Sequence, residues 1–164
     1  MSSVAMLMSR APPPAMPFHE AVCLDCSAVG ALSAACLQAA LCSATARVMA
    51  NLGPGCTEHL YRNALFLALR GAGFPDVRLE ATVEIFFDAV EIGWLRVDMV
   101  VSEQFAVELK FGWLPVVGSS SSSGRTPLEQ ARAYLRHGHF VGAFLVHFVP
   151  DGTTDVSLVL PSAA

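Results

Sequence analysis

The hydrophobic period of the sequence changes at Pro75, and this change restricts the fold more than any other feature. Upstream, residues 30–50 are rich in Ala, Leu and Met without internal Pro or Gly, which is typical of a helix. The segment 51–55 ends that helix, and Thr57 is expected to cap a second helix extending to Leu69. Beyond Pro75, Val, Ile and Phe recur with the two-residue period of strands, near residues 77–87, 91–101 and 105–112.

The second half of the sequence predicts one more helix between strands. Residues 118–124 are serines between two glycines, a low-complexity loop with no means of packing. The segment 126–129 places Thr, Pro and Glu at the cap, first and third positions of a helix, the pattern of a capping box. We expect strands over 140–149, which is apolar on both faces and therefore central, and near 155–160. The order is helix, helix, three strands, helix and two strands.

The composition indicates one folded domain preceded by a tail. The chain has 164 residues, of which 54% are hydrophobic and 15% charged, so it can form a hydrophobic core. Residues 1–28 contain three consecutive prolines and no periodic pattern, so we expect a flexible tail, with a targeting peptide as the weaker alternative. Residues 29–164 are expected to form a single domain. No apolar run reaches the roughly 18–20 residues that cross a bilayer, so we expect no membrane association.

The cysteines and the charges limit the functions to be considered. Five cysteines at irregular spacings fit reduced thiols in an intracellular protein better than a disulfide framework. Cys23 and Cys26 have the spacing of half a zinc site, but a second such pair is missing. The net charge of −4 argues against strong nonspecific binding to nucleic acid, although a local basic groove can coexist with it. Lys110 is the single lysine in a chain that otherwise uses arginine for positive charge, which suggests that this position requires a lysine.

Two of the predicted strands each have an apolar face and a charged face. Arg96 and Asp98 share one face of the first strand, and Glu108 and Lys110 share one face of the second, because alternate residues point the same way. The opposite faces carry Leu95, Val97, Met99 and Val101, and Phe105, Val107, Leu109 and Phe111.

The short polar loop 102–104 should join these strands into an antiparallel hairpin. If Val101 pairs with Phe105, then Asp98 lies directly opposite Glu108, with Cβ atoms about 4.5–5.5 Å apart. Two carboxylates at that separation repel, and a divalent cation such as Mg²⁺ neutralises them.

In the same register Arg96 lies opposite Lys110, and Lys110 can reach a water or a phosphate oxygen at the metal. The alternative is a solvated sheet face on which Lys110 merely bridges the acids Asp98 and Glu108.

The predicted flanking helices bring further polar residues in the right order. Glu58 lies on the helix after Gly55, with Tyr61 and Arg62 on the same helical face at i+3 and i+4. Gln130 lies on the helix after the serine loop, with Tyr134 one turn later. Each is weak evidence alone, since such residues are common on amphipathic helices.

Together these residues resemble the PD-(D/E)XK nuclease superfamily, and more narrowly its small GxxExxY proteins. The naming motif stands at 55–61, the superfamily acid at Asp98, the E-x-K motif at 108–110 and a Q-x-x-x-Y motif of the RecB-like branch at 130–134. The resemblance covers about residues 35–160. It implies an α/β fold with the restriction-endonuclease-like αβββαβ core, a mixed sheet flanked by helices, and an extra helix at the N-terminus.

The resemblance also implies roles for these residues. Asp98 and Glu108 would bind Mg²⁺ or Mn²⁺, helped by the backbone carbonyl of Leu109 and by Glu58 as an outer or second-metal ligand. Lys110 would position the attacking water and stabilise charge on the transition state.

Other residues are expected to support the site or bind substrate. Gln130 is counted with the catalytic residues, and the predicted substrate contacts are Tyr61, Arg96, Arg125, Arg132 and Tyr134. A solvated helix face is an equal alternative for Arg125 and Arg132. Two features depart from the family pattern. His59 stands where an apolar or small residue is expected, so the helix face there should differ from that of the family. The serine loop is longer than the usual connection, so the edge of the substrate cleft that it borders should differ as well.

Three hypotheses about function and assembly follow. The first is a metal-dependent phosphodiesterase acting on nucleic acid, with DNA favoured over RNA and RNA kept as an alternative. The second is a nuclease-fold module that no longer cuts and serves in binding, which the acidic charge favours. The third treats residues 30–50 as a homodimer interface.

Overall fold

The computed structural model describes residues 32–113 and 125–162. The predicted tail 1–28 and the serine loop 118–124 lie outside the described residues, as do Cys23 and Cys26. The elements are α1 (Ala34–Leu52), α2 (Glu58–Gly71), β1 (Val77–Phe87), β2 (Val90–Val101), β3 (Phe105–Phe111), α3 (Pro127–His137), β4 (Gly142–Phe148) and β5 (Thr154–Val159). This order confirms the predicted α/β fold class. Within the described residues no helix is long and apolar enough to cross a membrane.

The five strands form one mixed sheet in the order β1-β2-β3-β4-β5. Neighbouring strands are antiparallel, except that β3 and β4 run parallel because α3 connects them across the sheet. Val101 pairs with Phe105, which confirms the predicted hairpin register. β4 lies between β3 and β5 and is buried apart from Leu145, as expected for an apolar central strand.

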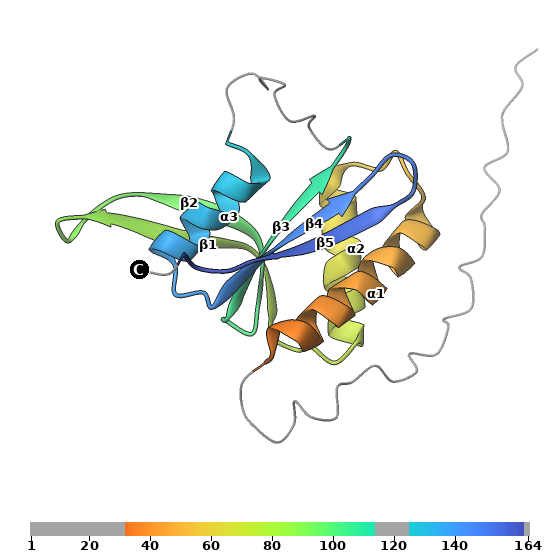
Figure 1. Ribbon diagram of the computed structural model, residues 1–164, viewed down its shortest axis with the longest axis horizontal. Coiled ribbons are helices and arrows are strands. Elements are labelled where there is room, and N and C mark those ends of the chain that lie inside the picture. The colour runs from red at the N-terminus through yellow and green to blue at the C-terminus, as the bar shows by residue number, and fades with distance from the viewer. Residues whose placement is uncertain (1–31, 114–124, 163–164) are drawn as a thin grey trace, which may run out of the picture.

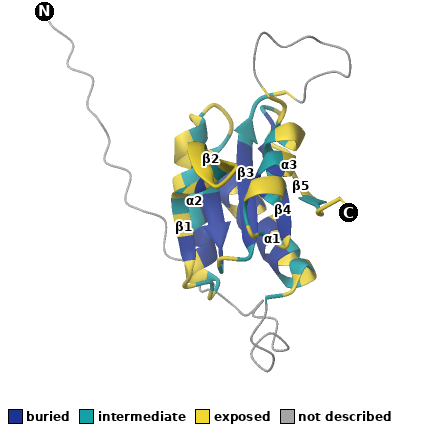
Figure 2. Cartoon of the chain, turned by 90° about the vertical axis from the view of Figure 1, so that its left-hand side faces the viewer, coloured by how far each residue is buried: buried dark blue, intermediate teal, exposed yellow. Residues whose placement is uncertain are grey.

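Helices cover both faces of the sheet (Figure 1). α1 and α2 pack on one face, where Leu41 and Leu65 meet Phe144 in the larger hydrophobic cluster. α3 packs on the other face, where Ala131 and Tyr134 meet a smaller cluster. The central strands between these layers are buried (Figure 2), so their backbone positions are fixed from both sides.

Two of the three described helices have a side-chain cap, and the cap of α1 is Ser33, which accepts from the N–H of Cys36. Thr126 and Glu129 form the predicted capping box of α3. Thr57 occupies the cap position of α2 but makes no side-chain cap bond, because its hydroxyl lies 3.0 Å from Nδ1 of His59. α2 nevertheless begins at Glu58, directly after Thr57, as the sequence predicts.

β1 and β2 extend beyond the rest of the sheet as a hairpin (Figure 1), and we call its outer part, residues 82–96, the arm. Its turn is Asp88-Ala89, both with positive φ, as a two-residue hairpin turn requires.

The expectation that the apolar residues of β2 share one face needs correction. Met99 and Val101 pack with α1 and α2, whereas Leu95 and Val97 pack with α3. The change occurs at Asp98, where β2 leaves β3 and turns toward α3.

Candidate active site

The candidate site lies at the point where β2 separates from β3. The ladder between these strands ends at the pair Met99–Val107. One residue farther along, the Asp98 carboxylate accepts a hydrogen bond of 2.9 Å from the backbone N–H of Leu109. The Asp98 side chain thus takes the place of the next backbone hydrogen bond between the strands. The prediction that Asp98 pairs with Glu108 in the ladder is therefore wrong.

Glu108 is the buried acid of the site, with 3% of the residue exposed. Its Oε1 lies 2.6 Å from Lys110 Nζ, and its Oε2 accepts a hydrogen bond of 2.7 Å from the Tyr134 hydroxyl. Burial and then the charge of Asp98 raise the pKa of Glu108 above its ordinary value. The two carboxylates therefore interact although they are not ladder partners.

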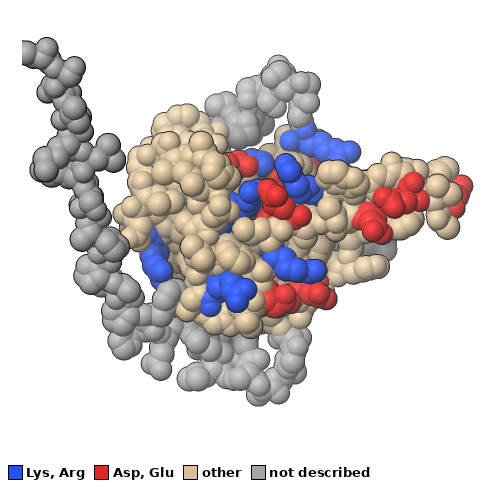
Figure 3. Space-filling model, turned by 180° about the vertical axis from the view of Figure 1, so that it is seen from behind, with Lys and Arg blue, Asp and Glu red and all other residues tan. Residues whose placement is uncertain are grey.

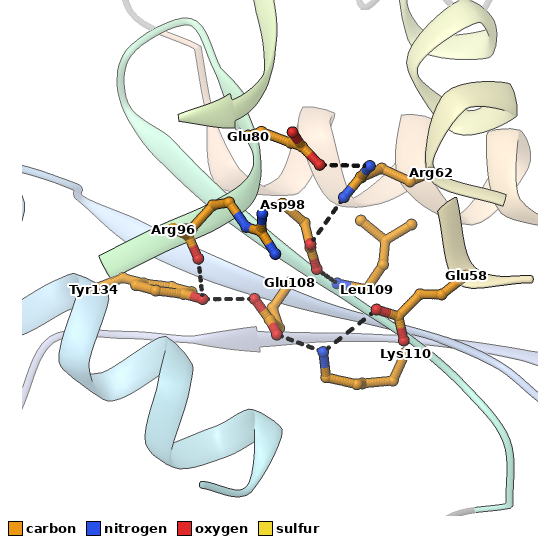
Figure 4. Close-up of polar contacts among 9 residues, drawn as sticks. All are labelled: Glu58, Arg62, Glu80, Arg96, Asp98, Glu108, Leu109, Lys110 and Tyr134. Carbon is orange, nitrogen blue, oxygen red and sulfur yellow. Dashed lines mark hydrogen bonds and ion pairs between the residues drawn. The ribbon is translucent and has the colours of Figure 1, made fainter. Parts of the chain in front are cut away.

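Lys110 lies between two acids from different elements. Its Nζ is 2.6 Å from Glu108 and 3.7 Å from Oε1 of Glu58 at the start of α2. Burial acts to lower the pKa of Lys110, but the hydrogen bond and charge of Glu108 outweigh it, so the pKa is raised. The single lysine of the sequence is thus held protonated beside the carboxylates (Figure 4).

Arg62 and Glu80 belong to this cluster, and the sequence did not identify them as site residues. Arg62 forms an ion pair of 2.8 Å with Glu80 and contacts Asp98 at 3.5 Å. A signal for Arg62 was available, because it lies one turn after Glu58 on the same helical face. None was available for Glu80, whose positive φ of 52° breaks the strand alternation.

The two tyrosines of the motifs stabilise the site from within. Tyr134 is 2% exposed, and its hydroxyl lies between Glu108 and the carbonyl of Arg96, at 2.7 and 2.9 Å. Tyr61 is fully buried, donates a hydrogen bond of 2.7 Å to the carbonyl of Gly53 and accepts one from the N–H of Cys56. Both rings are buried, and the predicted substrate contacts of the two tyrosines stay predictions.

Among the remaining predicted residues, Arg96 joins the centre through its backbone carbonyl, which accepts the hydrogen bond from Tyr134. The expected pairing of Arg96 with Lys110 does not form, because the strands have diverged. Arg96 is exposed, and its guanidinium extends toward Asp98 (Figure 4). Gln130 is half-buried one turn before Tyr134 in α3. Arg125 and Arg132 are exposed near the start and on the outer face of α3.

Comparison with known proteins decides the family. A family model described as the PD-(D/E)XK nuclease superfamily matches residues 36–157, which is more than half of the chain. The chain belongs to the PD-(D/E)XK nuclease superfamily. No curated protein matches it. A solved structure, titled "Crystal structure of SSO0001", is similar at 17% identity and a TM-score of 0.42, with 75% of this chain and 64% of that chain covered.

The donor chemistry of the candidate centre fits a hard divalent cation. Among the described residues, no three His, Cys, Asp or Glu side chains are gathered as a preformed metal cluster. Asp98 and Glu108 nevertheless supply carboxylate oxygens that repel each other, and Mg²⁺ is usually held by one or two carboxylates with several waters. The Glu58 side chain is 42% exposed, and its Oε1 lies 3.7 Å from Lys110 Nζ.

Replacing Tyr134 with Phe tests how the buried acid Glu108 is stabilised. The variant leaves a buried carboxylate without one of its donors, so we expect the free energy of unfolding to fall by about 1–3 kcal/mol. Urea denaturation followed by circular dichroism measures this. Ser157→Ala is the matched control, because it removes an exposed hydroxyl–carboxylate hydrogen bond and should cost less than about 0.5 kcal/mol. Equal stability losses in the two variants would contradict the prediction.

Proposed function

We propose that this chain is a divalent-metal-dependent nuclease that hydrolyses phosphodiester bonds, with DNA as the preferred substrate. One observation carries the proposal. Two carboxylates and a lysine from neighbouring strands meet where the strands separate, with Lys110 Nζ 2.6 Å from Glu108. We also infer that the chain is a GxxExxY protein of the RecB-like branch, on the motifs at 55–61 and 130–134.

Asp98 and Glu108 would hold Mg²⁺ or Mn²⁺, with the carbonyl of Leu109 and Glu58 as further ligands. When bound, the cation supplies polarisation of a phosphate oxygen and a water acidic enough to attack at neutral pH. The rest of the chemistry belongs to the chain's own residues.

Lys110 carries a positive charge toward the scissile phosphate, where it stabilises negative charge that develops during the reaction. Tyr134 holds Glu108 in place through its hydroxyl, and Arg62 holds Asp98. Gln130 supports the site from α3. Arg96, Arg125 and Arg132 are exposed and supply the positive charge for phosphate contacts.

The test is cleavage of single- and double-stranded DNA in graded Mg²⁺ or Mn²⁺. Wild type should cut only with metal, and a chelator should stop it. Asp98→Asn should need about 10- to 100-fold more metal for half-maximal cleavage, by analogy with losses of this size when metal-site partners are removed. Asp155→Asn, a change of an exposed acid, is the control and should match wild type.

A second function has its own supporting observation. The net charge of −4 disfavours binding of a polyanion, and a nuclease-fold module that binds without cutting would tolerate it. Calorimetric Mg²⁺ binding by a folded wild type that cuts no DNA or RNA at high concentration would decide for this binding module.

A further inference from the structure

The arm exposes more apolar surface than the fold requires. Val83 and Leu95 on one of its faces pack against α3. Five other large apolar side chains of the arm are each at least 55% exposed: Phe86, Phe87, Val90, Ile92 and Trp94. Folded proteins seldom leave such a group of neighbouring apolar residues uncovered unless it binds something.

One of these residues lies in line with the candidate active site. Trp94 is 60% exposed and precedes Arg96 by two residues in β2, so the two side chains share a face. Arg96 extends toward the carboxylates of the site (Figure 4). At about 3.3 Å per residue, Trp94 lies roughly 13 Å from Asp98 along the strand. A polymer bound at the carboxylates can therefore reach the indole.

The charges of the arm decide which part of a nucleic acid it can contact. Glu84 pairs across the hairpin with Trp94, and Asp88 and Glu91 lie near the tip, where acidic side chains are visible (Figure 3). These acids repel phosphates and so disfavour a duplex, which carries its phosphates on the outside and its bases inside. A single strand can turn its bases toward an aromatic side chain and its phosphates away from the acids.

Resting on the proposed nuclease function, we infer that the arm binds single-stranded nucleic acid beside the catalytic centre. Trp94 stacks on a base of the strand, and Arg96 contacts a phosphate between that base and the site of cleavage. The chain is then a nuclease that acts on single strands or on the unpaired ends of duplexes.

Fluorescence tests the contact directly, because the sequence contains only two tryptophans. Trp113→Phe leaves Trp94 as the single indole. The variant is titrated with a short oligothymidylate in Ca²⁺, which takes oxygen ligands as Mg²⁺ does. We expect the emission of Trp94 to be quenched by the single strand and to respond less to a duplex of equal length. Binding detected by anisotropy without any change in emission would overturn the inference.

Two substitutions at Trp94 separate stacking from general hydrophobicity. Trp94→Phe keeps an aromatic face and should bind labelled oligothymidylate within about threefold of wild type. Trp94→Leu keeps apolar surface but no ring, and its affinity should fall about 5- to 150-fold, the range given by the stacking of one base. Equal binding by the Leu variant and wild type would overturn the inference.

Cleavage of the same oligonucleotide in Mg²⁺ distinguishes the two proposals. Cleavage by wild type together with unchanged binding by Trp94→Leu keeps the nuclease function and overturns the role of the arm. Quenching of Trp94 without cleavage supports the arm and overturns the nuclease function. A shift in Trp94 emission with protein concentration alone, together with a dimer in sedimentation, would assign the arm to a second copy of the chain and overturn the inference.

Discussion

Lys110→Met is expected to slow metal-dependent DNA cleavage by about 10²- to 10³-fold, the effect of removing one charge-stabilising donor from an active site. Lys110 Nζ is the cation nearest to Glu108, at 2.6 Å, and methionine preserves much of its shape without the charge. Single-turnover cleavage at saturating Mn²⁺ measures the loss. Lys110→Arg keeps a charge but not the compact ammonium group, and it should recover only part of the rate. A Met variant that cuts as fast as wild type would refute the role of Lys110.

The same variant has a second readout that does not depend on activity. Lys110 lowers the pKa of Glu108, whereas burial and Asp98 raise it. Removing the lysine raises this pKa further above the unfolded value of 4.5. A raised carboxyl pKa reduces stability as the pH rises from the unfolded pKa to the folded pKa, because over that range the folded state binds more protons than the unfolded state. Lys110→Met should therefore be less stable than wild type at neutral pH, and the difference should shrink below pH 4.5.

The position of Lys110 beside Glu108 illustrates what the sequence could predict. Alternation in β3 placed both residues on one face, and the hairpin register from Val101 and Phe105 was also correct. These features depend on local periodicity and a short turn, which a single sequence records. The element order followed for the same reason.

The divergence of β2 from β3 at Asp98 could not be read from the sequence. It depends on α3, which packs against Leu95 and Val97 and draws the outer half of β2 away from the sheet. The positive φ of Glu80 accompanies this turn, and no glycine marks it. Tertiary contacts thus decide the one step of the ladder that forms the site, which is why alternation alone assigned Leu95 and Val97 to the wrong face.

The burial of Tyr61 is the second feature that the motif did not reveal. A tyrosine three residues after the candidate acid Glu58 is compatible with substrate contact or with the core. In the structure its ring stacks on Phe111 and Phe148, with centroids 5.1 and 4.6 Å away. Its hydroxyl forms hydrogen bonds with the backbone of Gly53 and Cys56 in the loop before α2. The residue therefore fixes the start of the helix that carries the acid of the motif.

Tyr61→Ala should accordingly lower the free energy of unfolding by about 3–5 kcal/mol, the usual cost of deleting a buried aromatic side chain. Tyr61→Phe retains the stacking and loses only the hydroxyl bonds, so it should cost about 1–2 kcal/mol. Chemical denaturation of both variants measures the difference. Leu67→Ala, on the same helix but 67% exposed, is the control and should change stability by less than about 0.5 kcal/mol. If Tyr61→Ala instead matched Leu67→Ala in stability and lost only affinity for DNA, Tyr61 would be a substrate contact after all.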